Sequence, residues 1–107
     1  MTRWLARVLT RVRDLAARRR VRFTLKARRE LAALRSGLDA DDACAVLADL
    51  KAEDSAGRLV SRLTGEWMFV FKPRVAGAVA YVKLILRDDC VVVSFHEEEG
   101  NRDEEDS

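Results

Sequence analysis

The chain has 107 residues, of which 49% are hydrophobic and 36% charged, and its formal net charge is +2. This length fits one ordinary domain and excludes two full ones. No apolar run approaches the roughly 18 to 20 residues that cross a bilayer, and arginines interrupt the N-terminal stretch where a signal peptide needs an apolar block, so we expect a cytoplasmic protein. Cys44 and Cys90 form no CxxC pair, which argues against a zinc site or a disulfide framework and for two small buried residues.

The near-neutral total conceals a charge gradient. Residues 1–36 contain twelve Lys or Arg and two acidic residues, a balance of +10. Residues 37–96 contain seven basic and nine acidic residues, a balance of −2, and residues 97–107 contain one basic and seven acidic residues, a balance of −6. The basic block is a candidate surface for phosphate or for an acidic partner protein, and a solvated helical face explains it equally well.

Residues 1–20 are predicted to form a basic amphipathic helix. Apolar residues recur from Trp4 to Ala16 at steps of three and four, and arginines fill the other face. Such a helix can lie on an anionic membrane, dock a partner or contact DNA, but it also suits the face of a sheet. We favour packing and expect no membrane partner.

Two further helices are predicted next. Val21–Phe23 is short and β-like, and Thr24 can cap a helix that runs to about Leu34 and ends at Gly37. Asp39 opens another helix, whose acidic first turn suits the helix dipole. The predicted buried face of this helix consists of Ala43, Val46, Leu47 and Leu50.

Beyond Asp54 the apolar residues alternate, which predicts strands at 67–72, 81–86 and 91–95 and a weaker one across 58–63. Pro73 should mark a strand end or edge, because it has no N–H to donate to a ladder. Helices followed by a strand meander predict an α+β fold with the N-terminal helices on one face of a three- to four-stranded antiparallel sheet. We expect one domain over residues 1–96 and an acidic, disordered tail over residues 97–107.

A hairpin centred on Asp88 and Asp89 sets the register of the last two strands. It pairs Tyr81 with His96, Lys83 with Ser94 and Ile85 with Val92, so the polar members share one sheet face. The opposite face should form the core, with Ala80, Val82, Leu84, Leu86, Val91, Val93 and Phe95.

This polar patch is suited to phosphate chemistry without a metal. A histidine can transfer protons near neutral pH, a lysine can stabilise charge on a phosphorane, and a tyrosine can bind a phosphate or stack under a base. The plain alternative is a solvated sheet face without a function. The sequence has no phosphate-binding loop, no GxSxG elbow and no HExxH motif.

The run EWMFVFKPRVAGAVAYVKLILRDDCVVVSFHEE resembles the MqsR family of toxins from bacterial type II toxin–antitoxin systems. The shared features are a tryptophan-led strand that ends in a basic-Pro-basic turn, a Tyr-x-Lys strand and a valine-rich last strand ending Ser-Phe. The segments RRVRFTLKARRELAAL and LDADDACAVLADLKAED are similar to the second and third helices of the family. The resemblance covers about residues 20–97.

The resemblance implies a RelE-like fold, a metal-independent endoribonuclease that cleaves messenger RNA, and a cognate antitoxin protein as partner, with no small-molecule cofactor. Of the four active residues of the family, the tyrosine corresponds to Tyr81, whereas two lysines correspond to His96 and to the Gly57–Arg58 position, and a glutamine corresponds to Met68. The predicted catalytic residues are therefore Tyr81, His96, Arg58 and Lys83, and the predicted RNA-binding residues are Lys72, Arg74, Arg62 and Met68. The alternative is a non-catalytic RNA- or protein-binding module that keeps the toxin fold.

Overall fold

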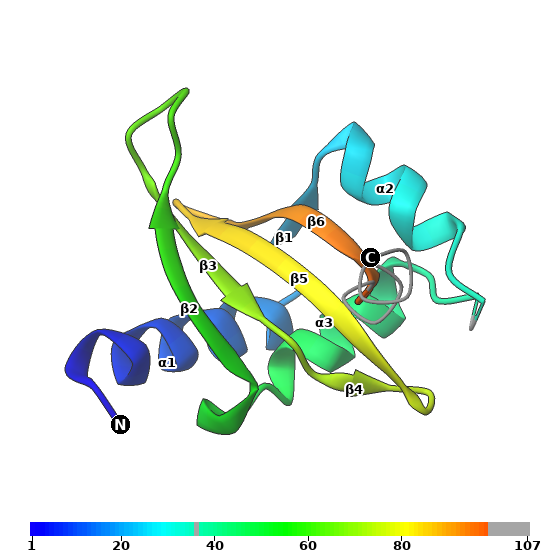
Figure 1. Ribbon diagram of the computed structural model, residues 1–107, viewed down its shortest axis with the longest axis horizontal. Helices are drawn as coiled ribbons and strands as arrows, with labels where there is room; N and C mark the ends of the chain where they lie inside the picture. Colours follow the sequence, from blue (N-terminus) through cyan, green and yellow to red (C-terminus); the bar gives the residue numbers. More distant parts are fainter. Residues whose placement is uncertain (36, 99–107) are drawn as a thin grey trace, which may run out of the picture.

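The computed structural model describes residues 1–35 and 37–98 (Figure 1). Its helices are α1 (Arg3–Ala17), α2 (Leu25–Ala32) and α3 (Ala40–Ala48), followed by a short 3-10 turn, η1 (Ala52–Asp54). Its strands are β1 (Val21–Phe23), β2 (Ser55–Val60), β3 (Trp67–Phe71), β4 (Arg74–Val75), β5 (Ala78–Leu86) and β6 (Cys90–Glu97). The predicted α+β class is confirmed, and all strands except β1 follow the helices in the chain.

The strands form one mixed sheet in the order β1-β6-β5-β3-β2, and β4 pairs with β5 beside this path. The prediction of a purely antiparallel sheet of three to four strands was wrong. β1 pairs in parallel with the start of β6, and Val21 lies opposite Cys90. A parallel pair has no hairpin to connect it, so adjacent sequence cannot reveal this pairing.

The helices do not all lie on one face of the sheet. Figure 1 shows α1 and α3 behind the sheet and α2 beside β6. The buried face of α1 supplies Leu9, Val12 and Leu15 to the core, where they join Phe71, Val82 and Phe95. This confirms that α1 packs on the protein, and no helix of the described residues is long and apolar enough to span a membrane.

Both predicted caps are present. The Thr24 hydroxyl accepts a hydrogen bond from the Ala27 N–H at 3.1 Å and begins α2. Asp39 accepts from the Asp42 N–H at 2.8 Å, and the Asp42 carboxylate accepts from the Asp39 N–H at 3.1 Å, forming a reciprocal cap at the start of α3. Gly37 follows α2 with φ +66°, a conformation that favours glycine.

The register of β5 and β6 is confirmed at one end and corrected at the other. Tyr81 lies opposite His96 and Lys83 opposite Ser94, but Leu84 lies opposite Val92, so Val93 is an extra residue in β6. This β-bulge shifts every later pair by one position. Ile85 therefore pairs with Val91 instead of Val92.

The bulge also changes which β6 residues enter the core. Cys90, Val92 and Phe95 are fully buried, whereas Val91 and Val93, predicted as core residues, are only partly buried. Burial raises the pKa of the Cys90 thiol to about 12 and also raises the pKa of Cys44. The expectation of two buried free cysteines is confirmed.

The weak predicted strand at 58–63 lies earlier in the structure. β2 ends at Val60, and residues 61–65 form a turn in which the Gly65 N–H donates to the Ser61 carbonyl at 2.8 Å. β2 contains its own register shift between Ser55 and Arg58, and Gly57 within it has φ +98°. Pro73 lies between β3 and β4, as predicted for a strand end.

If α1 belongs to the core, removing one of its buried side chains must destabilise the whole domain. We expect Leu9→Ala to lower the free energy of unfolding by about 2 to 5 kcal/mol, because Leu9 is 2% exposed. The matched change Arg7→Ala on the exposed face of the same helix should stay within about 0.5 kcal/mol. Urea denaturation followed by circular dichroism measures both. Equal effects of the two changes would show that α1 is an appended helix.

Candidate functional site

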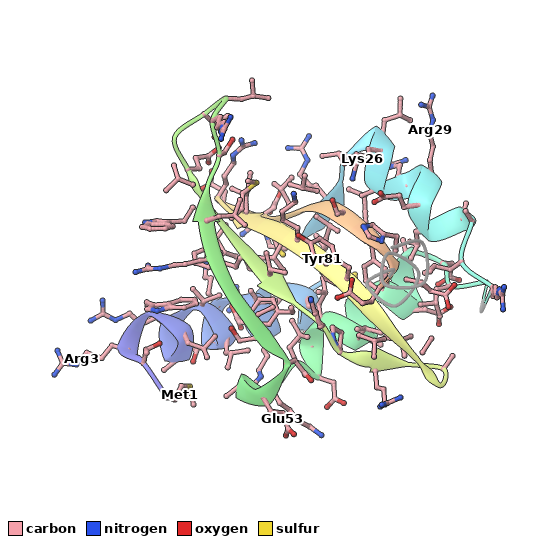
Figure 2. The ribbon with its side chains drawn as sticks, in the orientation of Figure 1. Met1, Arg3, Lys26, Arg29, Glu53 and Tyr81 are labelled. Atoms are coloured by element: carbon pink, nitrogen blue, oxygen red, sulfur yellow. The ribbon has the colours of Figure 1, made fainter. Side chains whose placement is uncertain are left out.

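The predicted polar patch lies on the sheet face that α1 and α3 leave open. Figure 2 shows Tyr81 on this face, near the middle of β5. Tyr81 and Lys83 on β5 lie opposite His96 and Ser94 on β6. Because Phe71 pairs with Val82, the same register places Lys72 beside Tyr81 on the other side. The structure thus brings three predicted catalytic residues, Tyr81, Lys83 and His96, together with the predicted RNA-binding residue Lys72.

Tyr81 and His96 form a stacked pair. Their ring centroids are 5.1 Å apart and the ring planes differ by 15°. The His96 Nδ1 atom lies 2.7 Å from the carbonyl oxygen of Glu97. A carbonyl only accepts, so Nδ1 carries the proton, and in the neutral ring Nε2 keeps a free lone pair. Both side chains are partly exposed, so this lone pair is available to a bound molecule.

Helix α2 borders the patch along the outer edge of β6. The Lys26 Nζ atom donates to the Ser94 hydroxyl at 2.8 Å and pairs with Glu30 at 2.9 Å. The other oxygen of Glu30 accepts the Phe95 N–H at 3.0 Å. Sequence reasoning missed this role of Lys26 and Glu30. Their spacing of four residues signals a helical ion pair but gives no indication of the contact with β6.

The environment of Glu30 favours its charged form. Partial burial raises its pKa, but hydrogen bonds from Lys26 and from the Phe95 N–H outweigh this effect, and the pKa is lowered overall. Glu30 also faces His96 across a cleft of about 330 Å³, whose other lining residues are Ala33, Leu34 and Glu97.

Arg58 does not join the patch. It pairs with Phe69, a residue of the helix-covered face, so its side chain lies on the opposite side of the sheet. There its guanidinium lies over two rings, 4.6 Å from the centroid of Trp4 and 4.0 Å from that of Trp67. The predicted catalytic cation at this position instead closes a cation–π contact between α1 and the sheet.

The predicted RNA-binding residues are spread out. The Lys72 ammonium forms an ion pair with Glu98 on the open face, beside Tyr81. Arg74 lines a separate cleft with Pro73 and Asp54, and Arg62 lies in the exposed turn after β2.

Met68 lies on the open face, opposite Leu59. Met68 lies two residues before Val70 on β3, and the register of β3 and β5 places it beside Ile85. This end of the face is apolar and is separate from the row that contains Tyr81 and His96. Within residues 1–35 and 37–98, no three His, Cys, Asp or Glu side chains are arranged to hold a metal ion.

Glu30 provides a test of the contact between α2 and β6. We expect Glu30→Ala to lower the free energy of unfolding by about 1 to 3 kcal/mol, because it leaves the Phe95 N–H without an acceptor, and Glu30→Gln to cost less because its amide oxygen still accepts. A carboxylate with a lowered pKa stabilises the fold above its ordinary value of 4.5 and loses this contribution as the pH falls through its folded-state value. The difference between wild type and Glu30→Gln in urea titrations should therefore shrink below pH 4.5. A difference independent of pH would contradict this role for the charge.

The comparisons with known proteins agree with the resemblance found in the sequence. The family described as "Motility quorum-sensing regulator, toxin of MqsA" matches residues 6–97, which include most of α1, all six strands and the polar patch. No curated protein matches the chain. The family match spans most of the chain. The chain belongs to the MqsR toxin family, and it is therefore the toxin of a toxin–antitoxin system, with an antitoxin as its partner.

Proposed function

We propose that this toxin is a metal-independent endoribonuclease that cleaves messenger RNA on the open face of the sheet. The observation that carries the proposal is the stacked pair of Tyr81 and His96, flanked by Lys72 and Lys83. The pair combines a proton-transfer group with an aromatic surface, and the two lysines supply positive charge for phosphates. The proposed RNA site is an open sheet surface and not a deep pocket. Such a surface suits an unpaired RNA strand.

The reaction that fits these groups is attack by a ribose 2′-hydroxyl on the adjacent phosphate. His96 Nε2 accepts the proton of the 2′-hydroxyl while the 2′-oxygen forms a bond to phosphorus. The bond between phosphorus and the 5′-oxygen breaks, and this oxygen takes up a proton from solvent. The products are a 2′,3′-cyclic phosphate and a free 5′-hydroxyl. The hydrogen bond of Nδ1 to the Glu97 carbonyl holds the ring with Nε2 free for this step.

The remaining residues have supporting roles in the proposal. Lys83 lies two residues from Tyr81 on the same face and stabilises the negative charge that builds on the phosphorane. Lys72 binds a phosphate on the other side of Tyr81 and exchanges its pairing with Glu98 for this contact. Arg58 has no role in this mechanism, because it lies on the other face. A messenger RNA substrate is consistent with a cytoplasmic toxin that its antitoxin neutralises.

Replacing His96 separates proton transfer from binding. We expect His96→Ala to lower the cleavage rate at least about tenfold, because proton transfer by a positioned group contributes about 10² to 10⁴. His96→Asn is the matched control, since its amide nitrogen can take the place of Nδ1 but it has no Nε2, and it should be as inactive as alanine. Cleavage of a fluorescently labelled RNA in the presence of a metal chelator measures the rates. Unchanged cleavage by either folded variant would remove His96 from the mechanism.

A second candidate function is a non-catalytic binding module that keeps the toxin fold. Met68 favours it, because it replaces the glutamine that the family resemblance implies with a side chain that offers almost no hydrogen bonding. Its neighbours on the open face, Leu59 and Ile85, are also apolar.

The two candidates differ in what Met68→Gln does. If the wild type is a nuclease, the glutamine should change the cleavage rate less than His96→Ala does, because Met68 is not in the row with His96. If the wild type binds RNA in a salt-sensitive way but leaves it uncut at high protein concentration, the binding module is favoured. Appearance of cleavage only in Met68→Gln would identify the methionine as the cause of the lost activity.

A further inference from the structure

We propose that Lys26, together with Lys83 and Ser94, forms a second phosphate-binding subsite next to the reactive one, so that α2 is one wall of the RNA path. This inference rests on the proposed function and extends it to a part of the chain that was not among the predicted site residues. The ligand is an unpaired polynucleotide, recognised at this subsite through a backbone phosphate.

The geometry of Ser94 is the first support. Its hydroxyl accepts a hydrogen bond of 2.8 Å from the ammonium of Lys26, a residue of α2. Lys83 on β5 lies directly opposite Ser94. Ser94 is only 2% exposed, so it serves as a fixed anchor for the Lys26 ammonium. Two lysines from different elements thus flank Ser94, one through its ammonium and the other through its position on the neighbouring strand. Such a pair suits one phosphate, whose several oxygens can contact both cations.

The position of the subsite is the second support. Ser94 lies two residues before His96 on β6, which is about 6.6 Å along a strand. Neighbouring phosphates of an extended RNA strand are separated by a similar distance. A phosphate held at His96 therefore brings the next phosphate of the strand to the row of Lys83, Ser94 and Lys26.

Lys26 has the capacity to take a further ligand. Its ammonium has three N–H donors, of which Glu30 and Ser94 use two. No other residue of the described ranges takes the third. The side chain is 61% exposed, so its ion pair with Glu30 is weak and can give way to a phosphate. Glu30 remains bound to the Phe95 N–H, so this exchange leaves the contact of α2 with β6 in place.

The charge around α2 is consistent with an anionic ligand. Arg22, Arg28 and Arg29 are exposed on β1 and α2, in the same part of the molecule. Figure 2 shows Lys26 near β6, whereas Arg29 extends from α2 away from the sheet. Arg29 therefore offers a control of equal charge on the same helix.

The experiment measures the salt dependence of binding to an RNA that cannot be cleaved. The probe is a fluorescent single-stranded oligoribonucleotide with 2′-O-methyl groups throughout, and its Kd is measured by anisotropy over a series of salt concentrations. Each lysine that contacts a phosphate adds about 0.7 to the slope of log K against log salt. We expect Lys26→Met to lower this slope by about 0.7 and to weaken binding about fivefold at 0.1 M salt. Arg29→Met should change the slope by less than half as much.

Two more variants separate charge from packing. Lys26→Arg keeps the positive charge and should keep the slope of the wild type. Glu30→Gln still accepts the Phe95 N–H but frees Lys26 from its carboxylate, so it should tighten binding at low salt. If Lys26→Met does not fold, these two variants still decide the proposal, because weaker or unchanged binding by Glu30→Gln overturns it.

The outcomes for the two proposals are distinct. If the wild type cleaves unmodified RNA and Lys26→Met keeps the full slope, the subsite is wrong and the nuclease stands. If Lys26→Met lowers the slope but the wild type never cleaves RNA, the subsite stands as part of a binding surface. Binding of the probe that is absent or insensitive to salt in the wild type overturns the subsite.

Discussion

The outer edge of β6 is the constraint on which the fold and the candidate site both depend. β1 pairs only with Cys90 to Val92, so the rest of this edge needs other partners for its backbone groups. Helix α2 provides them: the Thr24 hydroxyl donates to the Val93 carbonyl at 3.3 Å, and Glu30 accepts the Phe95 N–H at 3.0 Å. The position of α2 is thus determined by the unpaired edge, and α2 in turn brings Lys26 to the open face.

The bulge at Val93 allows β6 to bury its apolar side chains while His96 stays partly exposed. Before the bulge, Cys90 and Val92 point into the core, and after it Phe95 does so. Without the extra residue, a strict alternation from Cys90 would turn Phe95 toward the open face and His96 into the core. One inserted residue therefore lets the apolar residues of β6 fill the core while His96 stacks on Tyr81.

Much of this arrangement could be predicted from local sequence, and the rest could not. Caps at Thr24 and Asp39 and the pairing of Tyr81 with His96 depend on residues close together in the chain or on one hairpin. The bulge could not be predicted in this way, because Val93 follows two other valines and only the packing of the core selects which residue of the strand is left unpaired. The parallel pairing of β1, the position of Arg58 and the contact of Lys26 with Ser94 all join distant segments, so no local pattern contains them. The basic block was ambiguous for the same reason: only the fold shows that Arg20 pairs with Asp89 at 2.8 Å and that Lys26 contacts Ser94 at 2.8 Å.

The histidine at position 96 is matched to its surroundings in a way that a lysine is not. An imidazole has a flat face that stacks on Tyr81 and two nitrogens, one of which is held by the Glu97 carbonyl while the other remains free. A lysine has a single ammonium on a flexible chain, without a ring to stack and without a second nitrogen to fix its direction. The positive charge that a lysine would bring to this row is present on both sides, at Lys72 beside Tyr81 and at Lys26 and Lys83 beside Ser94. In the proposed mechanism the chemistry of this face is thus divided: the flanking lysines bind phosphates, and the stacked ring transfers the proton.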